Sequence, residues 1–465
     1  MSMKKREAEQ RSMWVATPQL PKSPGHVFYD KLNQVLERGG FDAFVEELCE
    51  PHYADGKGRP SIRPGVYFRM LFVGYFEGIG SQRGIAWRCA DSLSLREFLG
   101  LEPSARTPEH SSMTRIRQRL PEDVFDEVFA FVLRMAVEYG LLRGKTIAVD
   151  STTLEANAAM KSLVRRDTGA DWKTYVRGLA QAEGIEDPTD EELRRFDKKR
   201  KKKTSNAEWE SATDPDSRVA KMKDGRTHMA YKAEHALDVA SNLVVAAPVY
   251  HSNLSDARTV GATVERAREH LKKARSEKRV EEVIGDKGYH SAEALLQLVE
   301  EQQVRPYIAE PKMNGRRRWQ KRAPGQQAAV YANRYRVRGV RGRRLGRLRS
   351  ERVERSFAQT CETGGGRRVW LRGLLEVGKA HLIRVAARNL GVILFTLFGI
   401  GTPRSFQGAC VALRGTFLAA SCAIRSALRL LDDVLGALMA PPLRFIVAVI
   451  RIRNQPPGRS FSTGC

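Results

Sequence analysis

Cysteine is scarce in this chain and widely scattered. Six cysteines occur in 465 residues, and none forms a C-x-x-C pair. Structural zinc sites and disulfide frameworks use closely spaced or regularly patterned cysteines, so the sequence argues against both. The cysteine pattern fits a reducing cytoplasm.

Long apolar runs and a targeting segment are also lacking. The chain starts MSMKKREAEQRSMW, which has no apolar core and is not expected to act as a signal peptide. The longest clean apolar run, Leu390 to Ile400, is too short to span a bilayer. We therefore expect no membrane association.

Acidic residues are in the minority. Lys and Arg number 79 against 54 Asp and Glu, which gives a net charge of +25 and a pI near 10.0. This excess predicts a polyanionic partner, because cations that neutralise phosphates release condensed counterions. A ribosome-associated or merely basic protein is the alternative. The clustering of the charge favours binding of nucleic acid.

The length and a hydrophobic content of 42% allow two to four domains with sizeable cores. Residues 1–26 are polar and are expected to form a flexible arm. Residues 27–140 show helical patterns, and residues 141–400 mix strands with helices. Residues 401–465 are expected to form a helical tail of unknown role.

Three helical units are expected within residues 27–140. Arg63 to Glu77 carries an apolar stripe, and Ser81 to Leu99 forms the next unit. The third, Thr107 to Leu120, has Thr107 as its expected N-cap and a proline at its first helical position. A basic helix behind two apolar ones suits a helix-turn-helix-like DNA-binding domain, and a bundle with a solvated basic face fits equally well. The cations of this third unit are Arg115, Arg117 and Arg119.

An α/β pattern follows the helical region. A charged insertion is expected at about residues 155–225, and its stretch RRFDKKRKKK (194–203) holds eight cations in ten residues. Such a block is usually solvated and mobile, and it contacts DNA backbone without reading bases. A hairpin is then predicted, followed by helix, strand, helix and strand. These elements are His228 to Asp238, Leu243 to Tyr250, Ala257 to Glu277, Val280 to Gly285, Ser291 to Gln302 and Val304 to Ala309.

Residues 311–350 are expected to form a basic loop. They hold fourteen Lys or Arg and no Asp or Glu, and five glycines are expected to break any long helix. Trp319, Tyr331 and Tyr335 stand among the cations, which suits a channel where rings stack on unpaired bases. The alternative is a disordered basic loop without defined DNA contacts.

Three carboxylates have characteristic settings. Asp150 ends the apolar run TIAVD, Asp286 ends VIGD, and Glu354 stands in the helix-like stretch ERVERSF. Two strand ends and a helical glutamate can together hold a pair of divalent cations beside a phosphodiester. Taken singly, either aspartate would more often cap a turn. Asp238 also ends a strand, but the turn Ser241-Asn242 follows it, so a hairpin role is expected there.

Three segments resemble the DDE-type transposases of bacterial insertion sequences. They are AVDSTTLEANAAMKSLVRRDTG (148–169), VIGDKGYHS (283–291) and SERVERSFAQTCETGGGRRVWLRG (350–373), and they occur in the family's order. The resemblance covers roughly residues 20–400. It implies a ribonuclease-H-like mixed sheet flanked by helices, with an N-terminal all-α domain and a charged insertion after the first strand.

The resemblance also implies an activity. Asp150, Asp286 and Glu354 would form the acidic triad and hold two Mg²⁺ ions, with Mn²⁺ as a substitute. The enzyme would bind the terminal inverted repeats in double-stranded DNA, cleave the element ends and join them to target DNA. It would act as a homodimer or larger synaptic complex in the bacterial cytoplasm, associated with the nucleoid when bound to DNA. The residues expected to contact DNA are Arg115, Arg117, Arg119, Lys287, Tyr289, Trp319, Arg355, Arg367, Arg368 and Arg372.

One departure from the family pattern affects the strand contacts. Related groups carry an Arg four residues before the glutamate and a Lys or Arg seven after it, where this chain has Ser350 and Cys361. Arg349 and Arg352 stand close by, so the phosphate contact is expected to be shifted. Two alternatives stay open: a ribonuclease-H-like nuclease without strand transfer, and an inactive transposase-derived DNA-binding protein.

Overall fold

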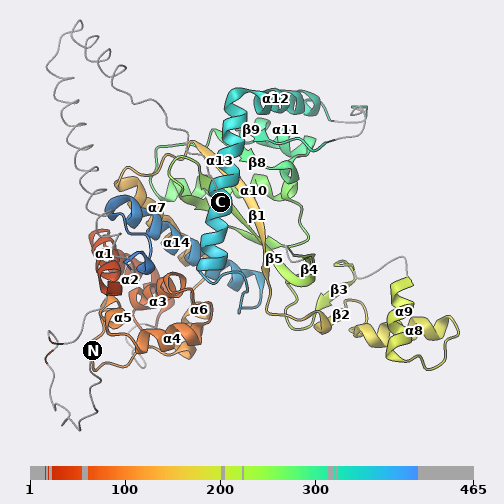
Figure 1. The fold of residues 1–465 in the computed structure, drawn as a ribbon, viewed down its shortest axis with the longest axis horizontal. Coiled ribbons are helices and arrows are strands. Elements are labelled where there is room, and N and C mark those ends of the chain that lie inside the picture. The colour runs from red at the N-terminus through yellow and green to blue at the C-terminus, as the bar shows by residue number, and fades with distance from the viewer. Residues whose placement is uncertain are drawn as a thin grey trace, which may run out of the picture.

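The computed structural model describes residues 24–54, 61–199, 205–222, 225–312 and 323–406, together with positions 16, 19 and 319–320. Most of the predicted arm 1–26 and the tail beyond residue 406 lie outside the described residues. Figure 1 shows a helical region joined to a sheet that carries helices on both faces.

The N-terminal region is helical, as predicted. Ser81 caps one helix by accepting a hydrogen bond from Gly84 N at 3.1 Å, and Ser92 caps the next through Leu95 N at 3.4 Å. The predicted unit Ser81 to Leu99 is therefore two helices, because Ser92 is a favourable N-cap. The helices before the first strand are α1 (Pro24–Arg38), α2 (Phe41–Cys49), α3 (Pro64–Phe76), α4 (Gln82–Ala90), α5 (Leu93–Phe98), α6 (His110–Arg119) and α7 (Glu122–Glu138).

The third predicted unit starts later than expected. Helix α6 begins at His110 with Glu109 at its N-cap, so Thr107 does not cap it. The Thr107 hydroxyl instead accepts a hydrogen bond from Arg96 Nη1 at 2.8 Å. The Thr107 side chain is therefore bound by Arg96, and α6 begins without a side-chain cap.

A mixed sheet forms the centre of the molecule. Its strand order is β4-β5-β1-β8-β9, and β6 and β7 also pair with β5. Strand β1 is antiparallel to β5 and parallel to β8, which is parallel to β9. The predicted hairpin, helix, strand, helix and strand are all present, and the ribonuclease-H-like α/β class is confirmed. The strands are β1 (Thr146–Glu155), β4 (Arg218–Lys221), β5 (Thr227–Asp238), β6 (Val244–Ala246), β7 (Val249–His251), β8 (Glu282–Gly285) and β9 (Arg305–Ile308).

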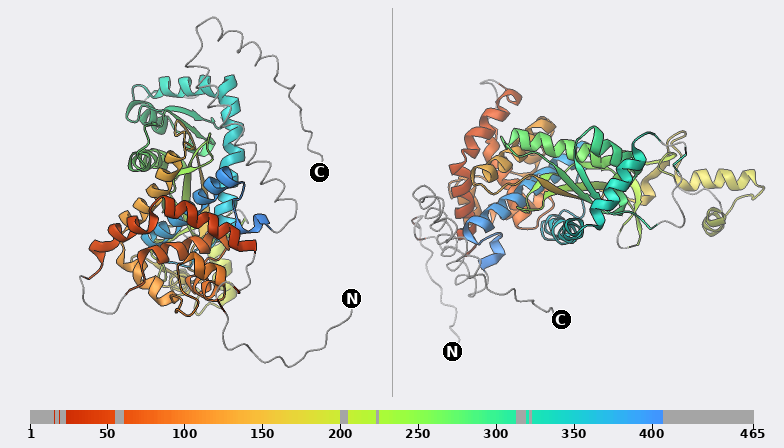
Figure 2. Two further views of the ribbon diagram at one scale, coloured as in Figure 1. Left: turned by 90° about the vertical axis from the view of Figure 1, so that its left-hand side faces the viewer. Right: turned by 90° about the horizontal axis from the view of Figure 1, so that it is seen from above.

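Helices α10 (Asp256–Lys273) and α13 (Val340–Phe357) lie on opposite faces of this sheet (Figure 2). Successive residues of β5 show it: Glu234 accepts from Thr259 and Thr263 of α10, whereas His235 contacts Ser356 of α13. Side chains alternate between the faces of a strand, so adjacent residues report on opposite sides. Helix α11 (Ala292–Glu300) connects β8 to β9.

The hairpin turn uses Asp238 as predicted. Its carboxylate accepts from Ser241 Oγ at 2.5 Å and from Arg143 N at 3.0 Å. Asn242 adopts a positive φ of 63° in the same turn. Asp238 therefore shapes the hairpin.

The predicted insertion is smaller and more ordered than expected. Glu155 still belongs to β1, and β4 belongs to the main sheet. Val176, Ala180 and Leu193 form a small core of their own. The stretch 194–199 is helical, and positions 200–203 lie outside the described residues. In Figure 1 this unit projects from the body. It contains β2 (Leu163–Arg165), α8 (Trp172–Ala182), α9 (Asp190–Lys199) and β3 (Trp209–Ser211).

The prediction of a basic loop at 311–350 is wrong for its C-terminal part. Helix α12 (Gln326–Arg338) and the start of α13 occupy residues 326–350, except for Gly339 between them. Gly342 lies inside α13, where a Cβ atom would stand 2.3 Å from Arg336 O. This glycine permits the close approach of two helices rather than breaking one.

Helix α14 (Leu374–Phe398) is the central helix of the core. By length and a mean hydropathy of 1.4 it is apolar enough to cross a membrane, but 67% of that segment is buried inside the protein. It contacts α7 and α3, and one hydrophobic cluster runs from Phe28 through the sheet to Leu394. The helical region and the sheet therefore share a core.

Candidate metal centre and nucleic-acid interface

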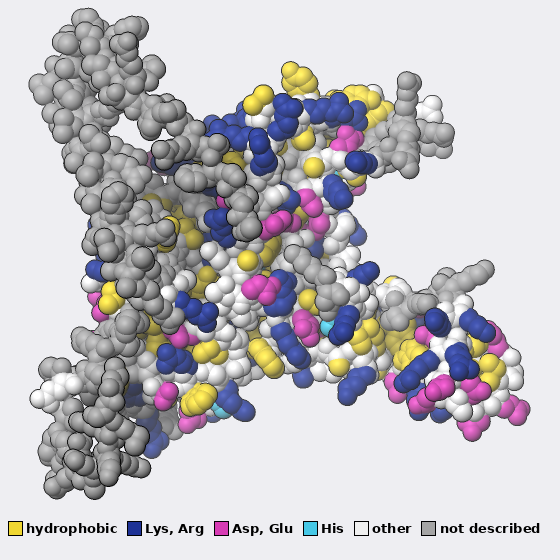
Figure 3. Space-filling view, in the orientation of Figure 1, with side chains coloured by type: hydrophobic (Ala, Val, Ile, Leu, Met, Phe, Trp, Pro, Cys, Tyr) yellow, Lys and Arg dark blue, Asp and Glu magenta, His cyan; other side chains and the backbone are white. Residues whose placement is uncertain are grey.

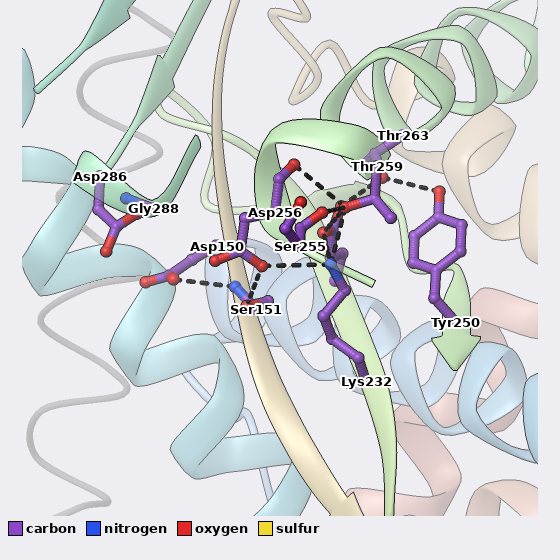
Figure 4. Close-up of polar contacts among 11 residues, drawn as sticks. Asp150, Ser151, Lys232, Tyr250, Ser255, Asp256, Thr259, Thr263, Asp286 and Gly288 are labelled. Atoms are coloured by element: carbon purple, nitrogen blue, oxygen red, sulfur yellow. Dashed lines mark hydrogen bonds and ion pairs between the residues drawn. The ribbon is translucent and has the colours of Figure 1, made fainter. Parts of the chain in front are cut away.

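Asp150 and Asp286 lie side by side on neighbouring parallel strands. In the β1–β8 register, Ile147 pairs with Val283 and Ala148 with Ile284. Two residues further along both strands stand Asp150 and Asp286, and Asp286 keeps an extended backbone. Neighbouring strands are about 4.8 Å apart, and residues in register point to the same face. The two carboxylates therefore share one small region, as Figure 4 shows.

Asp150 is mostly buried and is held by two donors. Arg349 Nη1 donates to Oδ2 at 2.6 Å, and Ser151 N donates to Oδ1 at 2.8 Å. Burial raises the pKa of Asp150 above its usual range, Arg349 opposes this rise, and the charge of Asp286 adds to it. Burial thus outweighs the ion pair with Arg349.

Asp286 stands at the start of a tight turn. Its Oδ1 accepts from Gly288 N at 2.8 Å, which closes the short helical turn η4 (Lys287–Tyr289). Tyr289 is fully buried and packs beneath Gly285, where a Cβ atom would meet the Tyr289 Cβ at 3.2 Å and its ring at 3.3 Å. The backbone thus fixes the direction of the Asp286 side chain.

Glu354, the third predicted acid, does not join the aspartate pair in this structure. Val353 and Phe357 are buried against the sheet, as the helical phase predicts, whereas Glu354 is exposed. It lines an open groove together with Ser350 and Arg347 of the same helix. Across the described ranges, no group of three or more His, Cys, Asp or Glu side chains is arranged to hold a metal ion. Of the three predicted carboxylates, Asp150 and Asp286 thus lie together and Glu354 lies apart from them.

The aspartate pair fits a hard divalent cation. Mg²⁺ prefers oxygen ligands, and one or two carboxylates suffice because waters and substrate phosphates complete the coordination. Asp150 and Asp286 supply adjacent carboxylates at the ends of paired strands, which is the donor set that such a cation takes.

The outer face of α13 is strongly basic. Arg343, Arg344 and Arg347 are exposed, and Arg343 and Arg347 line the groove that also contains Glu354. Figure 3 shows Lys and Arg side chains gathered over α12 and α13. Tyr335 of α12 is 84% exposed, so a free aromatic ring stands beside these cations. The surface suits a polyanion that runs past the aspartate pair.

The predicted recognition helix presents two of its three arginines. Arg115 and Arg119 are exposed, and Arg119 lies over the ring of Tyr53 at 4.7 Å. Arg117 is buried and forms an ion pair with Glu376 of α14. The assignment of Arg117 to DNA therefore needs correction: its charge is used to pack α6 against α14.

Of the predicted DNA contacts after Asp286 and in the basic segment, some are exposed and others are buried. Lys287 is exposed, but Tyr289 is buried and cannot present its ring to DNA. Trp319 is partly buried and donates from Nε1 to the Tyr331 hydroxyl at 3.2 Å. Lys287 thus remains available to DNA, whereas Tyr289 has a packing role.

The arginines after Glu354 lie in different settings. Arg355 is exposed and pairs with Glu351 at 3.0 Å. Arg367 donates to the Thr153 carbonyl at 3.0 Å and pairs with Glu362, which fixes it against β1. Arg368 and Arg372 are exposed as well, and Arg368 lies over the Trp370 ring at 5.2 Å.

Sequence reasoning missed a buried pair of histidines, one from β5 and one from α14, that packs against α13. His235 Nδ1 and Ser356 Oγ are 2.9 Å apart, and His235 Nε2 lies 3.0 Å from His381 Nε2. Burial lowers the pKa of both histidines, that of His381 to about 3. Ser356 stands two residues after Glu354, so this pair anchors the helix that carries the third acid.

It also missed the buried charges Lys232 and Glu234 of β5. Their side chains are 6% and 0% exposed, and they pair at 2.9 Å. A signal was present: a Lys and a Glu two residues apart in a strand lie on one face and can pair there. Lys232 also donates to Asp256, which accepts a hydrogen bond from Ser151, the residue after Asp150.

Comparison with known families supports these observations. The family model described as Transposase domain (DUF772) matches residues 18–119, and the model described as Transposase DDE domain matches residues 143–390. The second spans more than half of the chain and includes all three acids. No curated protein and no solved structure matches the chain.

Proposed function

Because the chain belongs to the family of DDE transposases, which cleave and join DNA, we propose that it moves an insertion sequence. It binds the terminal inverted repeats of the element, nicks the DNA at the element ends and joins the freed 3′ hydroxyl to target DNA. The observation that carries this proposal is the alignment of Asp150 with Asp286 across the β1–β8 pairing.

The family works with a divalent metal, and we propose Mg²⁺, with Mn²⁺ as a substitute. Asp150 and Asp286 would hold it, and we propose Glu354, which stands apart from the pair in this structure, as the third ligand. A divalent metal held there would supply activation of the attacking oxygen and stabilisation of the leaving oxygen of a phosphodiester. This scheme requires no Ser, Cys or His side chain as a nucleophile.

The chain's own residues would hold and orient the DNA. The DNA backbone would lie along the groove of α13, where Arg343 and Arg347 would neutralise its phosphates beside Glu354. Lys287, Arg355, Arg368 and Arg372 are further proposed phosphate contacts, since all four are exposed. Arg115 and Arg119 of α6 would contact the inverted repeat.

The proposed working form is a homodimer or a larger synaptic complex. Two element ends must be cut and joined in one event, so two active sites have to be held together. The proposed location is the bacterial cytoplasm, on double-stranded DNA of the nucleoid.

Cleavage of a labelled element end tests the acidic triad. Asp150→Asn, Asp286→Asn and Glu354→Gln should each reduce Mg²⁺-dependent cleavage by about 100-fold or more, the scale of losing a catalytic group. Binding to the end should persist, because removing negative charge near DNA favours the approach of phosphate.

Glu351→Gln is the matched control for Glu354→Gln. Glu351 stands three residues away on α13, lines the same groove and pairs with exposed Arg355. Because it is not a proposed metal ligand, its loss should leave cleavage near the wild-type rate. Cleavage retained in either Asp variant would refute the site. Cleaved ends without joined products would identify a nuclease instead of a transposase.

A further inference from the structure

A buried polar cluster lies beneath the aspartate pair, on the face of the sheet opposite α13 (Figure 4). The β1–β5 register shows the geometry: Asp150 pairs with His235, which faces α13, and Ser151 pairs with Glu234, which faces α10. We name this group the β5–α10 cluster. Its members are Ser151, Lys232, Glu234, Tyr250, Asp256, Thr259 and Thr263.

Lys232 is the cation of this cluster. Its Nζ donates to Thr259 Oγ1 at 2.8 Å and to Asp256 Oδ1 at 3.2 Å, and it pairs with Glu234 at 2.9 Å. The cluster therefore sets two carboxylates against one ammonium group. Burial raises the pKa of Glu234, and Lys232 opposes this rise.

Such an arrangement adds little net stability. Removing charges from water costs several kcal/mol per ion, and well-packed apolar residues often serve a fold equally well. A charged group kept in this position therefore needs another reason. The contacts of Asp256 provide one.

Asp256 touches the two chain segments that carry the aspartate pair. Its Oδ1 accepts from Ser151 Oγ at 2.9 Å, and Ser151 directly follows Asp150. Its Oδ2 lies against Gly288, where a Cβ atom would stand only 2.7 Å away. The N–H of Gly288 in turn holds Asp286. One carboxylate at the start of α10 thus braces both catalytic segments.

We propose that Asp256, held in place by Lys232, is a positioning residue that fixes the separation of Asp150 and Asp286 and so sets the affinity of the site for a divalent cation. The inference rests on the proposed function of the aspartate pair. Two adjacent carboxylates repel each other, and catalytic geometry must be held to within about 0.5 Å. Groups that orient metal ligands typically contribute about 10–100-fold to metal affinity.

Two substitutions separate the parts of this brace. Asp256→Asn keeps an oxygen that can accept from Ser151 but removes the charge that pairs with Lys232. Ser151→Ala removes only the hydrogen bond to Asp256. Asp256 Oδ2 and Asp286 Oδ1 stand 2.7 and 3.1 Å from the same Cβ position at Gly288, so Asp256→Asn also removes a negative charge near the pair. Ser151→Ala changes no charge, so a loss of metal affinity in that variant reports on position.

Asp126→Asn is the matched control. Asp126 is 4% exposed and pairs with Arg266 of α10 at 2.7 Å, so it also anchors this helix by a buried carboxylate. It does so at the α7 side, away from the aspartate pair. Its loss should lower the melting temperature without altering metal affinity.

The experiment is titration of the full chain with Mn²⁺, followed by electron paramagnetic resonance of the free ion. We expect Asp256→Asn to weaken Mn²⁺ binding about 10–100-fold and Ser151→Ala to weaken it by a smaller factor, with Asp126→Asn unchanged. Thermal unfolding of each variant shows that it is folded. If Asp256→Asn does not fold, Ser151→Ala decides by itself.

Wild-type affinity in both Asp256→Asn and Ser151→Ala would overturn the inference, as would an equal loss in Asp126→Asn. Asp150→Asn, measured in the same way, tests the proposed metal site itself. If Asp150→Asn binds Mn²⁺ as the wild type does, the site has failed and the inference with it. If Asp150→Asn loses binding and Asp256→Asn does not, only the positioning role has failed.

Discussion

The contact between Asp150 and Arg349 joins β1 to the helix that carries Glu354. The guanidinium lies 2.6 Å from Asp150 Oδ2, and both side chains are mostly buried. A divalent cation at the proposed site would compete with Arg349 for this oxygen. Its affinity would then depend on how easily Arg349 is exchanged for a stronger counter-charge.

The buried histidine pair predicts a dependence of stability on pH. In the folded chain the pKa of His381 lies at about 3 instead of its ordinary 6.5, because burial and Arg384 disfavour the charged ring. A lowered pKa contributes stability above the unfolded value and loses it as the pH falls toward the folded value. The window of loss therefore runs downward from about pH 6.5.

Melting temperatures at about pH 7 and pH 4 test this expectation. His381→Gln should lose less stability over this range than the wild type, by up to about 3 kcal/mol at 1.4 kcal/mol per pH unit. His52→Gln removes a half-buried histidine and serves as the control. Equal acid sensitivity of wild type and His381→Gln would contradict the assignment.

At the scale of elements, helix α6 combines two roles on two faces. Its exposed arginines, Arg115 and Arg119, point away from the core, while Arg117 lies under α14 and pairs with Glu376. The same residue type is thus exposed on one side, where we propose DNA contact, and packed on the other.

Charge substitutions in α6 separate these roles. Arg115→Gln with Arg119→Gln should weaken binding to the element end and lower the salt slope by about 0.9 for each lost phosphate contact. Arg117→Met should leave that slope unchanged and reduce stability by about 1 kcal/mol, because the half-buried Glu376 carboxylate loses one of its two cationic partners and keeps Lys379. Binding isotherms at several salt concentrations and thermal unfolding decide it. A reduced salt slope in Arg117→Met would assign Arg117 to DNA after all.

At the scale of the whole molecule, the helical region and the sheet are not separable units. Helix α14 contacts both α7 and α3, and 67% of its apolar segment is buried. The hydrophobic cluster is continuous between them. Removing the N-terminal helices would expose the apolar face of α14 to water.

A truncated chain of residues 142–465 should therefore not fold by itself. We expect no cooperative thermal transition and strong binding of a hydrophobic dye, whereas the full chain unfolds cooperatively. Circular dichroism during heating measures this. A cooperative transition in the fragment would show that α14 needs no cover from α7.

Residues 143–390 also illustrate which features local pattern determines. The strand ends at Asp150 and Asp286 follow from short β-branched runs, and the parallel pairing of β1 with β8 brings equivalent positions together. The helical phase of Val353 and Phe357 follows from the period of the helix. Each of these depends on neighbours in the sequence or on one strand pairing.

The positions of Glu354 and Arg117 were decided by tertiary structure. A helical period tells which residues share a face, but the placement of α13 on the sheet depends on Arg349, Ser356 and their distant partners. The burial of Arg117 depends on Glu376, which stands 259 residues later in the chain. Charge and order of residues were sufficient for the class of protein and the aspartate pair. Which charged side chains meet solvent and which meet one another is decided only by the packing of α14 against the helical region, because burial is a property of packing between distant segments.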